Sequence, residues 1–383
     1  MSTSKNYLNC LLGYLWLAIA ASNGAAAAEP AKIDLQLPLN GKEFTTYSIE
    51  FSATNESACI AGTDYDEMGT STGRLLLANL AGNSVRWQKS IAVPDGLAQL
   101  IPVQCLVGTD RVYLLANVDT SSSPPQARTS TYVMAFDMHG KQIASTRMQE
   151  AQNQYGYVMG LNSDGLTVVG YTRSNEGNGE HYGTFTSTFD AALRRRGTAV
   201  TRNTGAYTGP IGVRLVGANV YLIGRFFGAN VTRDDLGKFA ASRLLAAGGY
   251  SWSTPIDLSD NMRFKFSIMD DGTGYAIGYG SAKTTVARVT PQGKSLSAMT
   301  YPSRYCRTNT LASHGDGLLA VRRPCSGKTN GLVFVDFKAG QERLITAVPD
   351  NPVYVASHGT AWAVMASDKK GKLFLYSEMA GEL

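Results

Sequence analysis

A short run of apolar residues that mostly ends in a small residue recurs at a regular interval along this chain of 383 residues. Five copies end 54 residues apart, and two more follow at intervals of 44 and 43 residues. The seven copies end at Gly62, Ala116, Gly170, Gly224, Gly278, Arg322 and Met365. A fixed period of this length is typical of folds in which each repeat is one supersecondary unit.

Each repeat has room for four short strands. Residues 132–137, for example, follow the copy that ends at Ala116, and a tight turn with Gly140 comes next. Only 17% of the residues are charged and 40 are glycine, which excludes a coiled coil and favours strands and turns. We therefore predict an all-β, seven-bladed β-propeller. Two β-sandwiches are the alternative, but they do not explain the constant period.

The last repeat and a strand near the N-terminus are expected to share one blade. The last repeat has strands at residues 353–357, 361–366 and 373–377, and no room remains for a fourth. Residues 32–38 alternate between apolar and polar side chains, as an exposed strand does. We predict that this N-terminal strand supplies the missing outer strand, which would close the ring and remove an exposed sheet edge.

The N-terminus has the order of a secretory signal peptide: the cation Lys5, an apolar run over residues 8–21, and an Ala-x-Ala site that ends at Ala28. A membrane anchor is the alternative, but the run is shorter than the ~20 residues that span a bilayer. We expect residues 1–28 to be cleaved. Residues 29–383 would then be a single propeller, periplasmic or secreted, with no transmembrane segment.

An even number of cysteines remains after cleavage: Cys59, Cys105, Cys306 and Cys325. In an oxidising compartment this predicts two disulfides. Residues 308–323 read as a hairpin with its centre between Gly315 and Asp316, and Cys306 and Cys325 are equidistant from that centre. Opposite residues of a hairpin are close enough for a disulfide, so we predict this pair, and Cys59 with Cys105 by elimination. A zinc site is the alternative, but no C-x-x-C spacing occurs.

Two segments resemble a known repeat. Asn83 is followed four residues later by Trp87, and Gly248 is followed by Trp252. This is similar to the repeats of bacterial extracytoplasmic propellers of the quinoprotein-like superfamily, where a turn Gly precedes a Trp by four residues. The resemblance covers the repeat organisation of the mature chain. Members that bind a quinone cofactor have eight blades and a regular Trp girdle, so we expect no cofactor in this seven-repeat chain.

Loop lengths indicate which face binds a partner. In a propeller the loops between second and third strands share a face with the loops between blades. In the first four repeats these segments are long and polar, at residues 64–73, 119–130, 173–183 and 226–238, whereas the fifth has only residues 280–282. Long irregular loops cost ordering entropy and often carry function, so we expect binding on this face, at blades one to four.

Tyrosines and arginines are predicted to lie in the inter-blade segments of that face, a composition common in recognition surfaces. The candidate binding residues are Tyr155, Tyr157, Tyr207, Arg263, Arg304, Tyr305 and Arg307. The alternative is that these tyrosines only cover the ends of blades. His314 and His358 occupy the same turn in consecutive repeats and are a weaker candidate for a metal site, the alternative being two solvated side chains.

These observations favour a binding or scaffold module for a protein or an extracellular polymer, expected to be a monomer. No lipase-type serine elbow, zinc-protease helix, phosphate loop or dinucleotide fingerprint occurs, so we assign no catalytic residue. A net charge of +5 without clustered cations does not fit nucleic-acid binding. The alternative function is a propeller enzyme of the hydrolase, lactonase or lyase type, with its site at a mouth of the channel.

Overall fold

Every regular element in the described part of the chain is a β-strand. The structure is a computed structural model, and residues from Ala31 onward form one compact unit. It describes residues 30–37, 43–65, 71–94, 97–120, 128–163, 165–176, 179–202, 206–207, 211–227, 239–245, 249–256, 263–280, 283–327, 329–348 and 351–378. The all-β prediction is confirmed.

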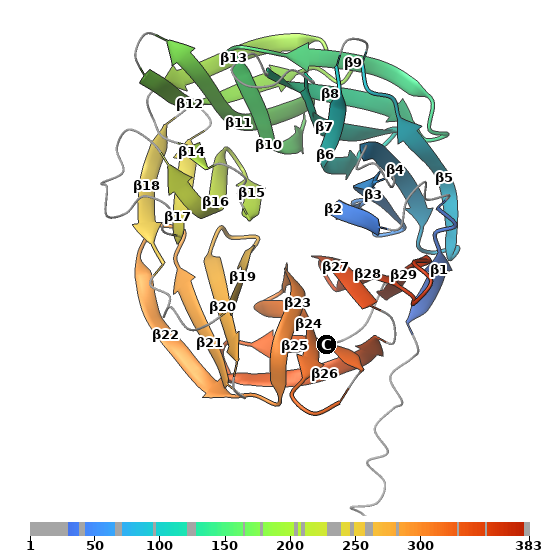
Figure 1. Cartoon of the computed structure of the whole chain (residues 1–383), viewed down its shortest axis with the longest axis vertical. Coiled ribbons are helices and arrows are strands. Elements are labelled where there is room, and N and C mark those ends of the chain that lie inside the picture. Colours follow the sequence, from blue (N-terminus) through green and yellow to red (C-terminus); the bar gives the residue numbers. More distant parts are fainter. Residues whose placement is uncertain are drawn as a thin grey trace, which may run out of the picture. The chain divides into compact units, whose positions relative to one another are not determined.

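Seven antiparallel sheets surround a common axis as the blades of a propeller, with the first strand of each blade nearest the centre (Figure 1). Blade 1 contains β2 (Glu43–Phe51), β3 (Ser57–Tyr65), β4 (Ser71–Asn79) and β5 (Ser84–Ile91). Blade 2 contains β6 (Gln99–Val107), β7 (Arg111–Asp119), β8 (Thr129–Asp137) and β9 (Gln142–Met148). Blade 3 contains β10 (Asn153–Asn162), β11 (Gly165–Glu176), β12 (Gly179–Phe189) and β13 (Arg195–Arg202).

The remaining blades repeat this arrangement. Blade 4 contains β15 (Gly212–Val216), β16 (Asn219–Phe227), β17 (Phe239–Leu245) and β18 (Tyr250–Pro255), and the short β14 (Ala206–Tyr207) also pairs with β16. Blade 5 contains β19 (Arg263–Ile268), β20 (Gly274–Gly280), β21 (Lys283–Val289) and β22 (Ser295–Pro302). Blade 6 contains β23 (Tyr305–His314), β24 (Gly317–Pro324), β25 (Asn330–Asp336) and β26 (Gln341–Val348).

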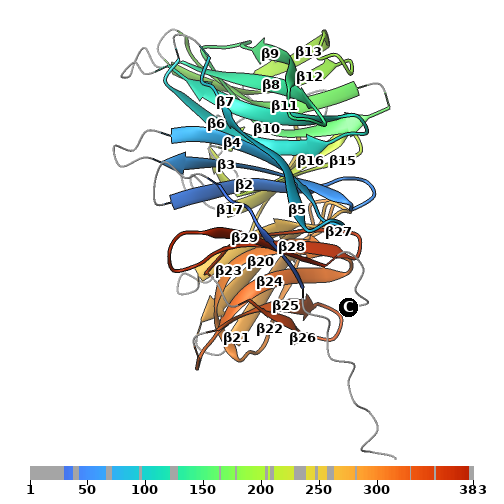
Figure 2. The same cartoon turned by 90° about the vertical axis from the view of Figure 1, so that its right-hand side faces the viewer.

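Blade 7 is completed by the N-terminal strand, as predicted. It contains β27 (Asn351–His358), β28 (Ala361–Ser367) and β29 (Leu373–Glu378), and β1 (Ala31–Asp34) pairs antiparallel with β29. Ile33 lies opposite Leu375, and Leu35 N donates to Leu373 O at 3.1 Å. The blue N-terminal strand thus lies outside the red strands of blade 7, next to blade 1 (Figures 1 and 2).

The seven repeat copies form the second strand of each blade, which is buried on both sides. In β3 the residues from Ser57 to Asp64 are all buried, and all but the last residue of β20 are buried too. A continuous apolar run rather than strict alternation is what such a doubly covered strand requires. The hydrophobic core lies between blades: Leu75 of blade 1, for example, belongs to one cluster with Leu100 and Leu114 of blade 2.

The two tryptophans of the resemblance pack against the next blade. Trp87 Nε1 donates to Met138 O at 3.1 Å, and Trp252 Nε1 donates to Pro291 O at 3.2 Å. A Cβ atom on Gly140 would lie 2.8 Å from the Trp87 ring, and one on Gly293 would lie 2.6 Å from the Trp252 ring. Each indole therefore requires a glycine in the tight turn of the following blade.

Both predicted disulfides are present, Cys59–Cys105 and Cys306–Cys325. The first joins β3 of blade 1 to β6 of blade 2, and the second lies within blade 6. The hairpin register behind the second prediction holds only near the turn, where His314 lies opposite Gly317. Bulges at Asn309 and Cys306 then shift the pairing by two residues. The two cysteines still meet, with their Cα atoms 4.8 Å apart.

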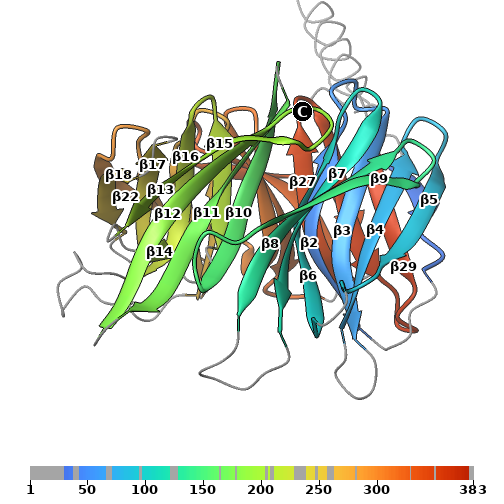
Figure 3. The same ribbon diagram turned by 90° about the horizontal axis from the view of Figure 1, so that it is seen from above.

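The strands run between two faces of the ring (Figure 3). We call the face at which each inner strand begins the loop face, and the opposite one, where inner strands end in tight turns such as those after His314 and His358, the turn face. Among the described residues no helix is long and apolar enough to cross a membrane.

Candidate functional site: a basic pocket on the loop face

A polar cavity of about 290 Å³ lies at the loop face of blades 5, 6 and 7. We call it the basic pocket because four cationic residues line it: Arg263, Lys265, Arg307 and Arg323. Three asparagines share the lining: Asn309, Asn330 and Asn351. The three arginines are exposed and Lys265 is half-buried. The larger cavity in the central channel has one arginine and no lysine in its described lining, so cationic side chains are more concentrated in the basic pocket.

The strands place these cations on common faces. Arg263 and Lys265 are two residues apart in β19, and residues at that spacing point to the same side of a strand. Arg307 of β23 lies directly opposite Arg323 of β24. Like charges directly opposite each other destabilise a sheet, so this pair weakens the fold unless an anion lies between them.

No acidic side chain compensates these charges in the described structure. The described lining contains no carboxylate, and none of the four cations forms an ion pair or a side-chain hydrogen bond with a described residue. Elsewhere in the same blade Arg322 and Lys338 both have acidic partners. The basic pocket is therefore suited to bind an anionic group by charge-assisted hydrogen bonds.

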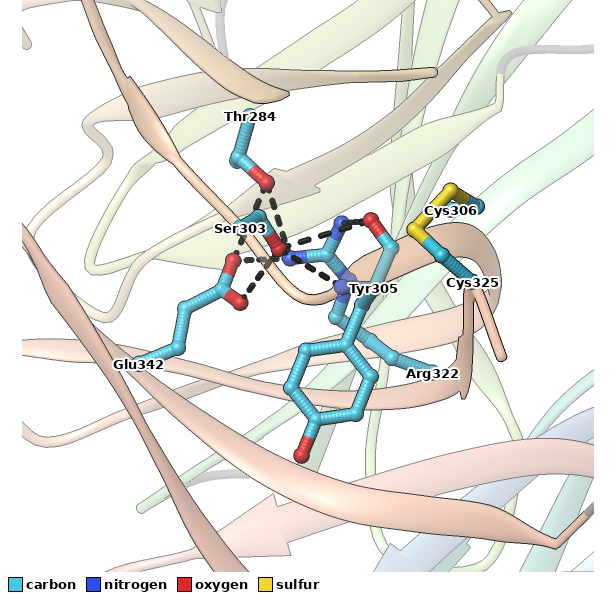
Figure 4. Close-up of a disulfide and its surroundings, with 7 residues drawn as sticks. All are labelled: Thr284, Ser303, Tyr305, Cys306, Arg322, Cys325 and Glu342. Carbon is cyan, nitrogen blue, oxygen red and sulfur yellow. Dashed lines mark hydrogen bonds and ion pairs between the residues drawn. A yellow bond between two sulfur atoms is a disulfide. The ribbon is translucent and has the colours of Figure 1, made fainter. Parts of the chain in front are cut away.

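A buried ion pair stabilises β24, the strand that carries Arg323 of the pocket lining (Figure 4). Arg322, the residue before Arg323, is fully buried and pairs with Glu342, whose side chain is 6% exposed. Arg322 also donates to Thr284 Oγ1 at 2.9 Å, and Ser303 Oγ donates to Glu342 Oε2 at 2.7 Å. These contacts join blade 5 to blade 6 and fix the end of β24 that carries Arg323.

Two of the predicted binding residues, Arg263 and Arg307, lie in this pocket, whereas two of their neighbours do not. Arg304 is exposed, with its guanidinium 5.2 Å from the centre of the Tyr305 ring. Tyr305 is only 3% exposed, and the Arg322 guanidinium also faces its ring at 5.4 Å. Tyr305 is thus a packing residue beside the Cys306–Cys325 disulfide. This agrees with the alternative given above, that such tyrosines cover the ends of blades.

The remaining candidates lie elsewhere. Tyr155 and Tyr157 are in β10, an inner strand rather than an inter-blade segment. Tyr155 stacks on Tyr171 with the ring centres 4.7 Å apart, and Tyr157, 5% exposed, packs against the same ring. The backbone of Tyr207 pairs with Phe226, and its side chain lies outside the described residues.

The basic pocket lies at blades 5 to 7, whereas the sequence predicted binding at blades 1 to 4 of the same face. Part of each of those long predicted loops falls outside the described residues, and binding there stays a prediction. The expected loop over residues 173–183 is wrong in one respect: the segment is mostly strand, because β11 continues to Glu176 and β12 begins at Gly179.

A second cavity, of about 680 Å³, is the central channel lined by the inner strands. Glu50 is half-buried in its wall, and Gln104 Nε2 donates to Glu50 Oε1 at 3.3 Å. Burial raises the pKa of Glu50, and Tyr354 nearby also has its pKa raised by burial. Arg214, further round the channel, pairs with Asp270 and donates to Ser313 Oγ at 3.1 Å. Arg214 is therefore neutralised by Asp270, whereas the hydrogen-bond partner of Glu50 is a neutral amide.

The two repeated histidines each bond to the next blade. His314 Nδ1 lies 2.7 Å from Ser357 Oγ, and His358 Nδ1 lies 2.8 Å from Asn55 Oδ1. Burial lowers the pKa of His314, which is 7% exposed. Within the described residues no three His, Cys, Asp or Glu side chains are grouped as a metal site requires. The two histidines are placed to connect turns of neighbouring blades.

Sequence reasoning missed Lys265, Arg323 and the three asparagines of the basic pocket. The alternation Arg263-Phe264-Lys265 was a usable signal for a basic strand face. The pairing of Arg307 with Arg323 also follows from the hairpin once its two bulges are known, but bulges at Asn309 and Cys306 have no clear mark in the sequence.

The comparisons with known proteins concern the fold. No family model matches the chain, and no curated protein matches it. Solved structures are similar in fold. A puromycin hydrolase variant matches at 13% identity over 89% of this chain, with a TM-score of 0.49. A regucalcin from Agrobacterium tumefaciens matches at 10% identity over 74% of this chain and 83% of that chain, with a TM-score of 0.37. The propeller domain of the Trilobed protease from Pyrococcus furiosus matches at 10% identity, over 80% of this chain and 96% of that domain (TM-score 0.36). The chain spans about half, 53%, of the hydrolase.

Proposed function

We propose that this propeller is an extracytoplasmic binding module that captures an anionic extracellular polymer in the basic pocket. The observation that carries the proposal is the convergence of four cations without a described acidic partner. A polymer is favoured over a protein partner because protein interfaces are centred on apolar and aromatic anchors. In the described lining, Tyr279 is the one aromatic residue and is only 7% exposed.

The compartment belongs to the same proposal. Disulfides persist in oxidising compartments, and this structure contains two. The predicted signal peptide over residues 1–28 would deliver the chain to the periplasm or the exterior. A relation to quinoprotein-like propellers is part of the proposal and rests on Trp87 and Trp252, each of which donates to a backbone carbonyl in the tight turn of the following blade.

A retention experiment tests the proposal. The mature chain is passed at about 0.15 M salt over immobilised polygalacturonate, dextran sulfate, polyphosphate and neutral dextran. We expect retention on at least one polyanion, none on dextran, and weaker retention at higher salt because exposed charges are screened. Arg263→Ala/Arg307→Ala should lose retention. The control Arg86→Ala/Arg196→Ala removes the same charge from exposed outer strands, and equal retention of the two double variants would contradict the proposal.

A second candidate function is an enzyme that acts in the central channel, and Glu50 favours it. A half-buried carboxyl group with a raised pKa in a cavity is the usual form of a general acid. A panel of ester, lactone and glycoside substrates would test this function. Turnover that is lost in Glu50→Gln, with retention on polyanions unchanged, would establish the enzyme; the absence of turnover on every class would exclude these activities.

A further inference from the structure

We infer that the basic pocket binds one uronate unit, an acidic sugar residue, of the polymer. This inference rests on the proposed function and adds the chemical class of the ligand. A uronate has a carboxylate at one end and hydroxyl groups around its ring. The ligand must therefore meet cations and neutral hydrogen-bonding groups within one small cavity.

The cations of the pocket suit a carboxylate. Three of the four are arginines, whose planar guanidinium groups bind carboxylates through two parallel hydrogen bonds. Arg307 and Arg323 lie opposite each other in β23 and β24, so one carboxylate between them neutralises a repulsive pair. Arg263 and Lys265 of the neighbouring blade supply positive charge from a second side.

The neutral groups of the pocket suit hydroxyls. Asn309, Asn330 and Asn351 all line the cavity, and amide side chains both donate and accept hydrogen bonds. Two acceptor atoms in the pocket wall, Asn330 Oδ1 and Thr308 Oγ1, are buried without a hydrogen-bond partner among the described residues. A sugar hydroxyl can donate to Asn330 Oδ1, which only accepts, whereas an ionised sulfate has no hydrogen to donate; the Thr308 hydroxyl can pair with either ligand.

The size of the cavity agrees with a single sugar ring. At about 290 Å³ it lies near the lower end of the range of small-molecule pockets, about 300–1,000 Å³. A lone sulfate or phosphate of five heavy atoms would contact only part of the lining. A ring with its substituents can reach cations and amides from three blades together.

Isothermal titration with a galacturonate trimer tests the inference, with maltotriose as the neutral trimer and sodium sulfate and phosphate as simple anions. We expect one trimer site per chain and no maltotriose binding. Arg307→Ala should weaken trimer binding about tenfold, since it removes a charge-assisted contact. Asn330→Ala should weaken it severalfold and leave sulfate binding unchanged. The control Arg196→Ala should match the parent, and equal melting temperatures would show that each variant is folded.

The outcomes separate this inference from the proposed function. If a sulfated or phosphorylated polymer binds more tightly than the uronate and Asn330→Ala binds the trimer like the parent, the sugar assignment is wrong and the polyanion function stands. If no polyanion binds, or if Arg307→Ala changes nothing, both fail. Binding of an acidic peptide in preference to the trimer would also overturn the inference, because it would replace the polymer by a protein partner.

Discussion

The guanidinium group of Arg322 and the carboxylate of Glu342 form a buried ion pair between β24 and β26, at the contact of blades 5 and 6 (Figure 4). Thr284 Oγ1 of blade 5 and Ser303 Oγ, in the connection to blade 6, both donate hydrogen bonds to the Glu342 carboxylate. Buried charges cost desolvation and are tolerated only with such partners. The pair thus fixes the wall on which Arg323 faces the basic pocket.

Removal of one partner of this pair should be strongly destabilising. We expect Glu342→Gln to lower the free energy of unfolding by about 3–5 kcal/mol, because it leaves a buried guanidinium uncompensated. Chemical denaturation measures the change. Asp316→Asn breaks the exposed pair with Lys338 and serves as control, with no measurable effect expected. A Glu342→Gln protein as stable as Asp316→Asn would show that the pair is not a structural requirement.

The two disulfides should contribute unequally. Cys59–Cys105 closes a separation of 46 residues and Cys306–Cys325 one of 19. In the chain-entropy model these correspond to about 4 and about 3 kcal/mol. Peptide mapping without reductant should first show these two pairs and no other. The double variant Cys59→Ser/Cys105→Ser should then melt lower than Cys306→Ser/Cys325→Ser, and the opposite order would contradict the prediction.

Closure by β1 can be tested at one side chain. Leu35 is fully buried against blade 7, so Leu35→Ala should cost about 2–5 kcal/mol. Leu344→Ala, at a leucine that is 46% exposed, provides the matched control and should cost far less. Deletion of residues 30–37 should expose the edge of β29 and cause aggregation. A deletion protein that melts like the full mature chain would disprove the structural role of the strand.

Stability should fall in mild acid because of His314. Burial lowers the pKa of this imidazole below its ordinary value of 6.5, although Asp270 opposes the shift. The unfolded chain therefore takes up the proton first, and the free energy of unfolding should fall as the pH drops below about 6.5. His314→Gln should reduce the difference between pH 7.5 and pH 5.5, with His139→Gln as the control. An unchanged difference in His314→Gln would assign the effect to other groups.

The propeller architecture could be predicted from the sequence because each repeat corresponds to one blade. Each copy of the apolar run is a doubly buried second strand, so its spacing counts the blades directly. The closure by residues near Ile33 followed from the missing fourth strand of the last repeat. The Cys306–Cys325 disulfide followed from the symmetry of the predicted hairpin, and Cys59–Cys105 followed by elimination. The two bulges in the hairpin shift its register but leave Cys306 and Cys325 within bonding distance.

The site was harder to predict because neighbouring residues have opposite environments. Arg322 and Arg323 are adjacent, yet the first is buried against Glu342 and the second is exposed at the pocket. Which arginine faces inward depends on strand register and on a partner twenty residues away. Tyr157 and Tyr305 look like recognition residues in the sequence, but their rings pack against Tyr171 and between guanidinium groups. The residue type alone does not tell whether a side chain on a strand faces the core or the solvent.

Chemical protection of arginines tests the central claim most directly. A protein of residues 29–383 is treated with an arginine-specific dicarbonyl reagent, with and without saturating polygalacturonate, and the modified sites are mapped by mass spectrometry. We predict that Arg263, Arg307 and Arg323 react severalfold more slowly with the polymer present, while Arg86 and Arg196 react at the same rate. Unchanged rates at the three pocket arginines, with the polymer bound, would contradict the assignment of the basic pocket as the binding site.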